Sequence, residues 1–468
     1  MKQGNPSQGD PVEERAARIK LELSEGKMTS ALELGSMSTR RRRIAEISRR
    51  HKDEGLRTLA HFIDIHWLYA AWKKTRKDGA LGVDDMTWGE YDRQWHGNLD
   101  FLLERFKSGE YYAPPAKRSY IPKDDGKQRP IGIMTMEDKV LQRGVSMVLE
   151  DIYEQEFYDF SFGYRKGRSQ HQALEVIWET LMNFNGGYVL SLDVQGYFDT
   201  VRHSDLRMFL DRRVRDGVIR KTIDKWLKAG VMEGGQVHVS EEGTPQGGVI
   251  SPMLSNIYLH NVLDEWMVKT VIPRLKGRAE MIRYADDVLI VFSCEEDAKR
   301  VKRVLTKRFA KYGLKAHPEK TKLINFKKPG RNGRRRDGGK PGSIDFLGFT
   351  LHWGLSRKGN PVVKRKTMKS RLKRSLGRSK EWLRANRNMK IRKQWKAINS
   401  KLKGHYQYFG VTGNIASLQL YYQEVRRLWC YWLRRRSQRS KMTWERFNRI
   451  LGYLQLARPH IPKSVYRT

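Results

Sequence analysis

Two short apolar runs with an acidic tetrapeptide between them form the clearest pattern along the chain. Residues 281–283 and 288–291 are mostly apolar and partly β-branched, a composition that favours strands. Tyr284-Ala285-Asp286-Asp287 separates them, so we predict a hairpin that carries two carboxylates at its tip. An Asp pair is not buried without a cation or a basic partner. A divalent metal would satisfy the pair, and an exposed acidic turn is the alternative.

A second apolar run, residues 188–192, ends in Asp193. Two strands that each deliver Asp to one end of a sheet can place three carboxylates around two Mg²⁺ ions about 3.5–4 Å apart, as in-line phosphoryl displacement requires. Mg²⁺ suits this reaction because it accepts few protein oxygens and keeps sites for phosphate. We predict Asp193, Asp286 and Asp287 as the catalytic residues of a nucleotidyl transfer. The metal site is assigned to Asp193, Val194, Asp286 and Asp287.

Other patterns predict the elements around these acids. The Asp-Gly pair at 125–126 indicates a hairpin over residues 121–133 that brings Lys123 and Arg129 together. The glycine-rich loop at 243–248, which contains Gln246, opens a helix through residues 251–259. Residues 346–349 read as a tight apolar hairpin. Helical spacing in residues 421–433 predicts one buried face of a helix, with the arginines pointing elsewhere. That predicted face comprises Tyr421, Val425, Leu428, Trp432 and Leu433.

Charge points to a polyanionic partner. The chain of 468 residues carries 92 Lys and Arg against 52 Asp and Glu, a net charge of +40. From Lys364 to Thr468 there are 29 Lys and Arg and 3 Asp and Glu, so most of the excess lies in the last 105 residues. Solubility alone does not require such a concentration. We therefore expect a nucleic-acid surface there.

The order of these motifs resembles a reverse transcriptase palm, and more narrowly the reverse transcriptase/maturase proteins encoded inside group II introns. The resemblance rests on Asp193 in a strand, the loop at 243–252, Tyr-Ala-Asp-Asp, and Phe346-Leu347-Gly348-Phe349. Upstream blocks similar to the family's lie at 121–133 and 161–169, and residues 402–410 resemble its maturase domain. The matching blocks span residues 50 to 460.

The resemblance implies roles for individual residues, each beside a structural alternative. Lys123 and Arg129 would clamp the triphosphate of the incoming nucleotide, or form a solvated basic hairpin. Gln246 would contact template or nucleotide, or sit in a plain turn. Phe198 would exclude a ribose 2′-hydroxyl, or belong to the core. Lys320 would protonate the leaving pyrophosphate, or face solvent. Phe346, Leu347, Gly348 and Phe349 would grip the primer end, or make a small core turn.

The fold class expected from these elements is α+β, a right-hand polymerase with fingers, a palm built on an antiparallel sheet, and an α-helical thumb or maturase domain. We place a basic, partly flexible N-terminal extension at 1–50, an N-terminal segment and fingers at 51–185, the palm at 186–358 and the basic helical thumb at 359–468. RNA-binding residues are expected in the N-terminal helix, in the 161–169 block and in the thumb. They are Arg41, Arg42, Arg43, Arg165, Arg168, Arg434, Arg435 and Arg436.

Cysteine usage and hydropathy limit the remaining possibilities. Cys294 and Cys430 are the two cysteines of the chain, which allows neither a disulfide framework nor the Cys/His-rich HNH endonuclease that some intron proteins carry at the C-terminus. No apolar run approaches the ~20 residues of a membrane span. Residues 1–26 lack the apolar segment of a signal peptide. We expect a bacterial cytoplasmic protein that associates with the nucleoid through its DNA target.

The sequence therefore predicts an RNA-directed DNA polymerase that uses two Mg²⁺ ions and dNTPs. By resemblance it binds group II intron RNA as a ribonucleoprotein, assists its splicing, and copies it into cDNA at a DNA target during retrohoming. Two alternatives stay open: a domesticated relative in DNA repair or phage defence, and a non-catalytic RNA-splicing chaperone.

Overall fold

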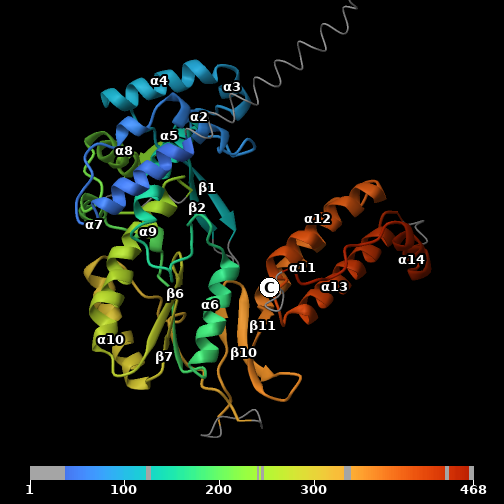
Figure 1. Ribbon diagram of the computed structural model, residues 1–468. Coiled ribbons are helices and arrows are strands. Elements are labelled where there is room, and N and C mark those ends of the chain that lie inside the picture. The colour runs from blue at the N-terminus through green and yellow to red at the C-terminus, as the bar shows by residue number, and fades with distance from the viewer. Residues whose placement is uncertain are drawn as a thin grey trace, which may run out of the picture. The chain divides into compact units, whose positions relative to one another are not determined.

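The computed structural model describes residues 37–122, 128–239, 242–243, 247–330, 339–437 and 442–462. Contacts divide the chain into two compact units. The first consists of Met1–Arg168, Val194–Pro273 and Leu305–Ala316, and the second of Ser169–Asp193, Arg274–Val304 and His317–Thr468. Both units combine helices with sheets whose strands pair mostly antiparallel (Figure 1), which confirms the α+β class. The boundaries of fingers, palm and thumb stay predictions.

The first unit combines helices with a four-stranded sheet of order β2-β1-β4-β5. Its strands are β1 (Ala116–Pro122), β2 (Gln128–Ile133), β4 (Val231–Glu233) and β5 (Gln236–His238). The predicted hairpin over 121–133 is confirmed, because β1 and β2 pair antiparallel from Lys117↔Ile133 to Pro122↔Gln128. The helices of this unit that carry most of its core are α2 (Ile65–Lys73), α4 (Trp95–Ser108), α5 (Met136–Tyr153), α7 (His203–Asp211), α8 (Gly217–Lys228) and α9 (Ser251–Leu259). A short helix α3 (Trp88–Arg93) and a 3₁₀ turn at Ala60–Phe62 complete the N-terminal part.

Buried polar caps fix several of these helices. Thr135 begins α5 by accepting a hydrogen bond from the backbone N–H of Asp138. Asp216 begins α8 in the same way, through the N–H of Ile219. Its carboxylate also accepts the backbone N–H groups of Leu59 at 2.7 Å and Ala60 at 2.9 Å. One buried acid thus joins two segments that are far apart in the sequence. After α9 the chain continues in two π-helical turns, His260–Asp264 and Met267–Val271, and a 3₁₀ turn, Ile272–Arg274.

The second unit contains a four-stranded antiparallel sheet of order β6-β7-β3-β8. Its strands are β3 (Tyr188–Leu192), β6 (Ala279–Tyr284), β7 (Asp287–Phe292) and β8 (Lys322–Asn325). β3 and β7 read as continuous apolar runs because both lie inside the sheet and are buried on both faces. Helix α6 (Gln170–Asn183) packs beside β6, and α10 (Glu295–Lys311) follows β7 (Figure 1).

A second sheet of this unit, of order β11-β10-β9, precedes the C-terminal helices. It consists of β9 (Ile344–Phe346), β10 (Phe349–Leu355) and β11 (Pro361–Thr367). The helices are α11 (Lys369–Ala385), α12 (Ile391–Phe409), α13 (Ile415–Arg434) and α14 (Trp444–Tyr453), which confirms the expected helical character of this region.

The buried face of α13 differs from the one predicted. Trp429 and Cys430 are buried, whereas Leu428 and Trp432 are only half-buried. The prediction was wrong at these positions because α13 has neighbours on several sides. Tyr421 meets Ser379 of α11, and Trp429 donates to Gln394 of α12 at 2.8 Å and meets Phe447 of α14 edge-on. Helical spacing alone does not reveal how many neighbours a helix has.

Candidate active site

The acidic tetrapeptide forms the turn of the β6–β7 hairpin, as predicted. Tyr284 pairs with Asp287, which leaves Ala285 and Asp286 as a two-residue turn. Ala285 has φ 57°, a left-handed conformation that an L-residue adopts at a cost. The fully buried Arg283 donates to the carbonyl oxygen of Ala285 at 3.1 Å. This contact supports the turn from beneath.

Asp193 reaches the same edge of the sheet through β3. Leu192 pairs with Val288 in the antiparallel ladder, so the next residue, Asp193, lies across from Asp287 in register. The carbonyl oxygen of Asp193 accepts the backbone N–H of His317 at 2.8 Å, which fixes the chain where β3 ends. Two strands therefore deliver carboxylates to one end of the sheet.

The carboxylates influence one another electrostatically. The pKa of Asp287 is raised to about 6, first by the protein atoms that crowd it and then by the negative charges of Asp286 and Asp193. Asp287 is nevertheless exposed to solvent. Arg371 and Lys320 oppose the rise. Lys320 Nζ lies 3.5 Å from Asp193 Oδ2, and the lysine side chain is 61% exposed. Lys320 is thus a solvent-screened neighbour of the acids and not a buried substitute for a metal.

The three aspartates have the right chemistry for Mg²⁺, but their side chains are not gathered into a complete metal site. Among the described residues, no group of three or more His, Cys, Asp or Glu side chains is gathered closely enough to hold a metal ion. Like charges repel when no cation lies between them. Asp193, Asp286 and Asp287 nevertheless meet at one sheet edge and supply the hard oxygens that Mg²⁺ takes. Val194 is buried and bridges to Ala316, and its place in the metal site stays a prediction.

A cavity of about 450 Å³ connects Asp287 with the predicted primer grip. Phe346 pairs with Phe349, so the hairpin turn is Leu347, at φ 47°, and Gly348, at φ 80°. This confirms the tight apolar hairpin. Tyr408 at the end of α12 donates to the carbonyl oxygen of Leu347 at 3.1 Å and stacks on the ring of Phe349. The turn is therefore held firmly beside Asp287.

The arginines of α11 that line this cavity were not predicted from the sequence. Arg371, Arg374 and Arg378 all line it, and their spacing of three and four residues places them on one face of the helix. Arg371 also lowers the pKa of Asp287. The spacing is visible in the sequence, but the many basic residues nearby hide it. Such a row suits the phosphates of a polynucleotide.

The predicted nucleotide-binding residues lie partly outside the described residues. Lys123 and Gln246 belong to segments that the structure does not describe. Arg129 is exposed on β2, where it pairs with Ile121. Phe198 lies in a 3₁₀ turn (Tyr197–Asp199), half-buried, with its ring centre 5.5 Å from that of Tyr197. The nucleotide role of these residues stays a prediction.

Several arginines predicted to bind RNA have intramolecular partners. Arg41, in a helix over residues 37–50, makes a two-pronged ion pair with Asp151 at 2.7–3.0 Å. Arg165 is buried and donates to Glu154, Tyr158 and Ser161. Arg41 and Arg165 therefore stabilise the fold, whereas Arg42 and Arg43 are exposed. Residues 1–36 of the predicted N-terminal extension lie outside the described residues.

The other four arginines of that set differ in exposure. Arg168 pairs with Asp159 at 2.5 Å. Arg434 and Arg435 are exposed at the end of α13, and Arg435 lies over the ring of Tyr431. Arg436 donates to the carbonyl oxygen of Arg387 at 2.7 Å. Arg434 and Arg435 are therefore the best placed of these for an external ligand.

Comparison with known proteins places residues 121–351 in the family model "Reverse transcriptase (RNA-dependent DNA polymerase)". Protein YkfC of Escherichia coli K12 is 37% identical over 206 residues, which cover 43% of this chain and 53% of that protein. The group II intron-encoded protein LtrA of Lactococcus lactis is 35% identical over 233 residues, 48% of this chain and 38% of that protein. A 91 kDa protein in the cob intron of Schizosaccharomyces pombe is 37% identical over 170 residues, 36% of this chain and 21% of that protein. The matches thus span about half or less of the length of these relatives.

Proposed function

We propose that this chain is a reverse transcriptase, an RNA-directed DNA polymerase that copies a group II intron RNA into cDNA, because residues 121–351 match the reverse transcriptase family model and the chain is related in sequence to a group II intron-encoded protein. One observation carries the proposal. Asp193 and Asp287 face each other across β3 and β7, and the cavity at Asp287 also contains the Phe346–Phe349 turn and a row of arginines. Primer extension needs carboxylates for the metal ions, a turn that holds the primer end and cations that bind phosphates, all close together.

Each part of the site has a role in this proposal. Asp193, Asp286 and Asp287 would hold two Mg²⁺ ions, which supply charge stabilisation to the attacking 3′-hydroxyl and to the leaving pyrophosphate. Lys320, whose Nζ lies 3.5 Å from Asp193 Oδ2, would give a proton to the pyrophosphate. The Leu347–Gly348 turn, fixed by Tyr408, positions the primer end. Arg371, Arg374 and Arg378 take backbone phosphates.

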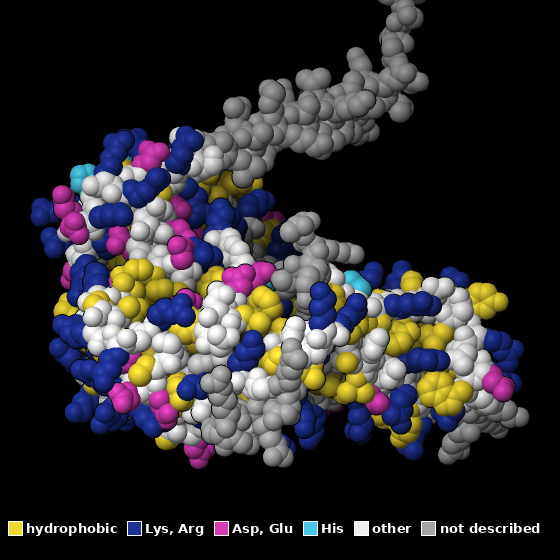
Figure 2. Space-filling view, turned by 60° about the horizontal axis from the view of Figure 1, so that its bottom comes forward, with side chains coloured by type: hydrophobic (Ala, Val, Ile, Leu, Met, Phe, Trp, Pro, Cys, Tyr) yellow, Lys and Arg dark blue, Asp and Glu magenta, His cyan; other side chains and the backbone are white. Residues whose placement is uncertain are grey.

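We further propose that the basic C-terminal helices bind the intron RNA as a ribonucleoprotein and assist its splicing, and that cDNA synthesis takes place at a DNA target during retrohoming. Lys and Arg side chains cover much of the face shown in Figure 2. From Lys364 onward the chain has 29 basic and 3 acidic residues, and most of the basic ones lie in β11 and helices α11–α14. Phosphate contacts of this kind give affinity that falls steeply with salt. No helix among the described residues is long and apolar enough to cross a membrane.

A primer-extension assay tests the proposal. The full chain is incubated with an RNA template, an annealed DNA primer, dNTPs and Mg²⁺, and the products are resolved by length. We expect extension on RNA that stops when EDTA removes the metal. A chain that binds the template-primer and leaves the primer unextended at every Mg²⁺ concentration would favour the RNA-splicing chaperone.

Metal affinity should depend on pH through Asp287. Because its pKa is raised to about 6, the carboxyl is mostly protonated at pH 5 and mostly charged at pH 7. A metal ion must displace that proton, so affinity should fall by up to about tenfold per pH unit below pH 6. Mn²⁺ binding followed by electron paramagnetic resonance at pH 5.0, 6.0 and 7.5 measures this.

Asp287→Asn is the matched variant for that titration. It removes the titrating group at nearly constant size, so its weaker Mn²⁺ binding should lose most of the pH dependence between pH 5 and 7. Equal Mn²⁺ affinity of the unmodified chain at pH 5.0 and 7.5 would contradict a metal role for Asp287.

A further inference from the structure

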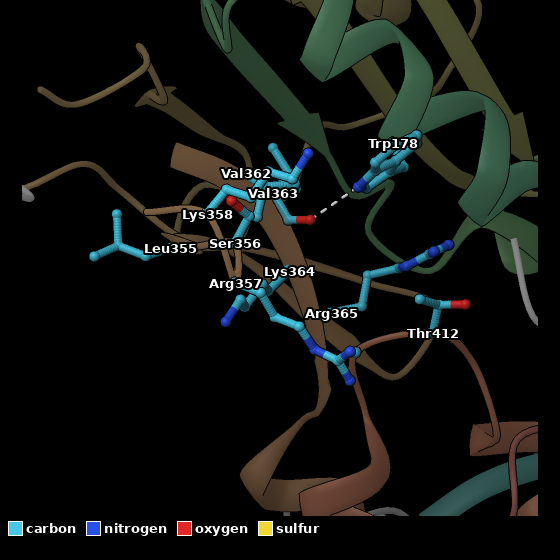
Figure 3. Close-up of a pocket in the computed structure, with 11 residues that line it drawn as sticks. Trp178, Leu355, Ser356, Arg357, Lys358, Val362, Val363, Lys364, Arg365 and Thr412 are labelled. Atoms are coloured by element: carbon cyan, nitrogen blue, oxygen red, sulfur yellow. Dashed lines mark hydrogen bonds between the residues drawn. The ribbon is translucent and has the colours of Figure 1, made fainter. Parts of the chain in front are cut away.

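A cavity of about 760 Å³ lies at the edge strand β11 and shares no lining residue with the cavity at Asp287. Its walls come from α6, from the β10–β11 hairpin and from the turn before α13 (Figure 3). None of the catalytic, nucleotide-binding or primer-grip residues assigned above lines it. The lining residues are Trp178, Leu355, Ser356, Arg357, Lys358, Val362, Val363, Lys364, Arg365, Thr412 and Gly413.

Helix α6 covers part of the free edge of β11 and fixes an aromatic ring there. The indole Nε1 of Trp178 donates to the carbonyl oxygen of Val363 at 2.8 Å, the bond drawn in Figure 3. The backbone N–H of Val363 lies 3.5 Å from the sulfur of Met182, one turn further along α6. The hydrogen bond to Val363 holds the Trp178 ring in one orientation. The side chain is half-buried, so part of it still lines the cavity.

Positive charge dominates the lining. Arg357, Lys358, Lys364 and Arg365 contribute four cations, and none of the described lining residues is Asp or Glu. Arg365 is only 5% exposed, and its guanidinium lies 5.9 Å from the centre of the Trp178 ring. The pKa of His352, which pairs with Lys364 across the hairpin, is lowered by burial and then by Lys366 and Lys364. The local potential is therefore positive.

We propose that this cavity holds one unpaired nucleotide of a single-stranded nucleic acid, with its phosphate against the cations and its base against Trp178. An aromatic ring beside Arg and Lys is the combination that single-stranded sites use, since every base has a face that can stack. A double helix keeps its bases stacked inside and could not place one against Trp178. The volume suits a ligand of this size. The inference rests on the proposed function only for the polynucleotide nature of the partner.

Photo-crosslinking locates the contact directly. The full chain is mixed, without Mg²⁺ or dNTPs, with a single-stranded RNA 12-mer that contains 4-thiouridine or with a DNA 12-mer that contains 4-thiothymidine. Peptide mapping after irradiation should find crosslinks in the peptides with Trp178 and residues 355–365. Crosslinking by RNA alone identifies an RNA segment as the occupant, and equal crosslinking by DNA extends the site to DNA. Absence of crosslinks from both peptides would overturn the proposal.

Charge reversal in the hairpin turn tests the phosphate contacts without disturbing the core. Arg357 and Lys358 are exposed, so Arg357→Glu/Lys358→Glu should fold normally. Loss of two phosphate contacts should lower the slope of log Kd against log salt by about 1.4 for single strands and weaken binding about tenfold at 0.15 M salt. Fluorescence anisotropy of the labelled 12-mer measures both.

The matched control carries the same charge change elsewhere. Arg303 and Lys307 are exposed on α10, and Arg303→Glu/Lys307→Glu should leave both the slope and the crosslinks unchanged. If the control pair weakens binding as much as the hairpin pair, net charge explains the effect and the cavity does not.

Failure of the proposed function would look different. A chain that crosslinks at Trp178 but never extends a primer refutes the polymerase and leaves the cavity proposal standing. A chain that extends primers but shows no crosslink in either peptide refutes the cavity proposal and supports the polymerase.

Discussion

Alanine in place of Asp286 or Asp287 should abolish cDNA synthesis, with a loss of at least about a thousandfold in the rate of primer extension. Asp286 is the second residue of the two-residue hairpin turn, and Asp287 is the first residue of β7. Asp287 also shares an electrostatic environment with Asp193. In the proposed mechanism, removing either carboxylate would leave too few oxygens to hold two Mg²⁺ ions, and the chemical step would lose the charge stabilisation that the ions supply.

Template binding should survive these substitutions. The contacts proposed for the RNA lie on basic side chains of other elements, and losing one negative charge in a chain of net charge +40 does not weaken attraction to phosphate. Single-turnover primer extension and template-primer affinity are measured on the same preparations. Glu296→Ala is a suitable control, because Glu296 is 75% exposed and pairs with Lys276 on the surface. Normal extension by Asp286→Ala or Asp287→Ala would end the metal assignment.

Features that depend on local sequence could be predicted well. The β6–β7 hairpin, the β1–β2 hairpin and the Phe346–Phe349 turn follow from a change of pattern over a few residues. Asp193 follows the end of β3 and Asp287 begins β7, and antiparallel pairing brings the end of one strand to the start of the other. Such arguments need only short-range chemistry and the geometry of a sheet.

Features that depend on long-range packing could not be predicted. Arg371 reaches the environment of Asp287 from a helix more than eighty residues further along the chain, and nothing in the local pattern of α11 indicates which sheet it will meet. Arg41 and Arg165 look like free basic residues in the sequence, yet each has a carboxylate partner in the fold. A guanidinium that binds RNA and one that binds a neighbouring acid have the same local sequence signal.

Gly187→Ala should break the sheet that positions Asp193. Gly187 has φ +74°, and a Cβ there would lie 2.4 Å from the carbonyl oxygen of Phe292 at the end of β7. Its own carbonyl oxygen accepts the N–H of Phe326 at 2.9 Å, just beyond β8. The next residue, Tyr188, begins β3 between both strands. A shift at this point is carried along β3 to Asp193, and a slip of one residue would turn every side chain to the other face.

The expected cost is about 2–5 kcal/mol, from the left-handed conformation of an L-residue and the enforced displacement of β7. Hydrogen exchange of peptides from β3 and β7 should become faster, and primer extension should fall together with it. Gly404→Ala is the matched control: Gly404 lies within α12 with open space where a Cβ would stand, so alanine should stabilise by about 0.5–1 kcal/mol. Unchanged exchange in Gly187→Ala would mean that β3 does not depend on this close approach, and the register that sets Asp193 opposite Asp287 would need another cause.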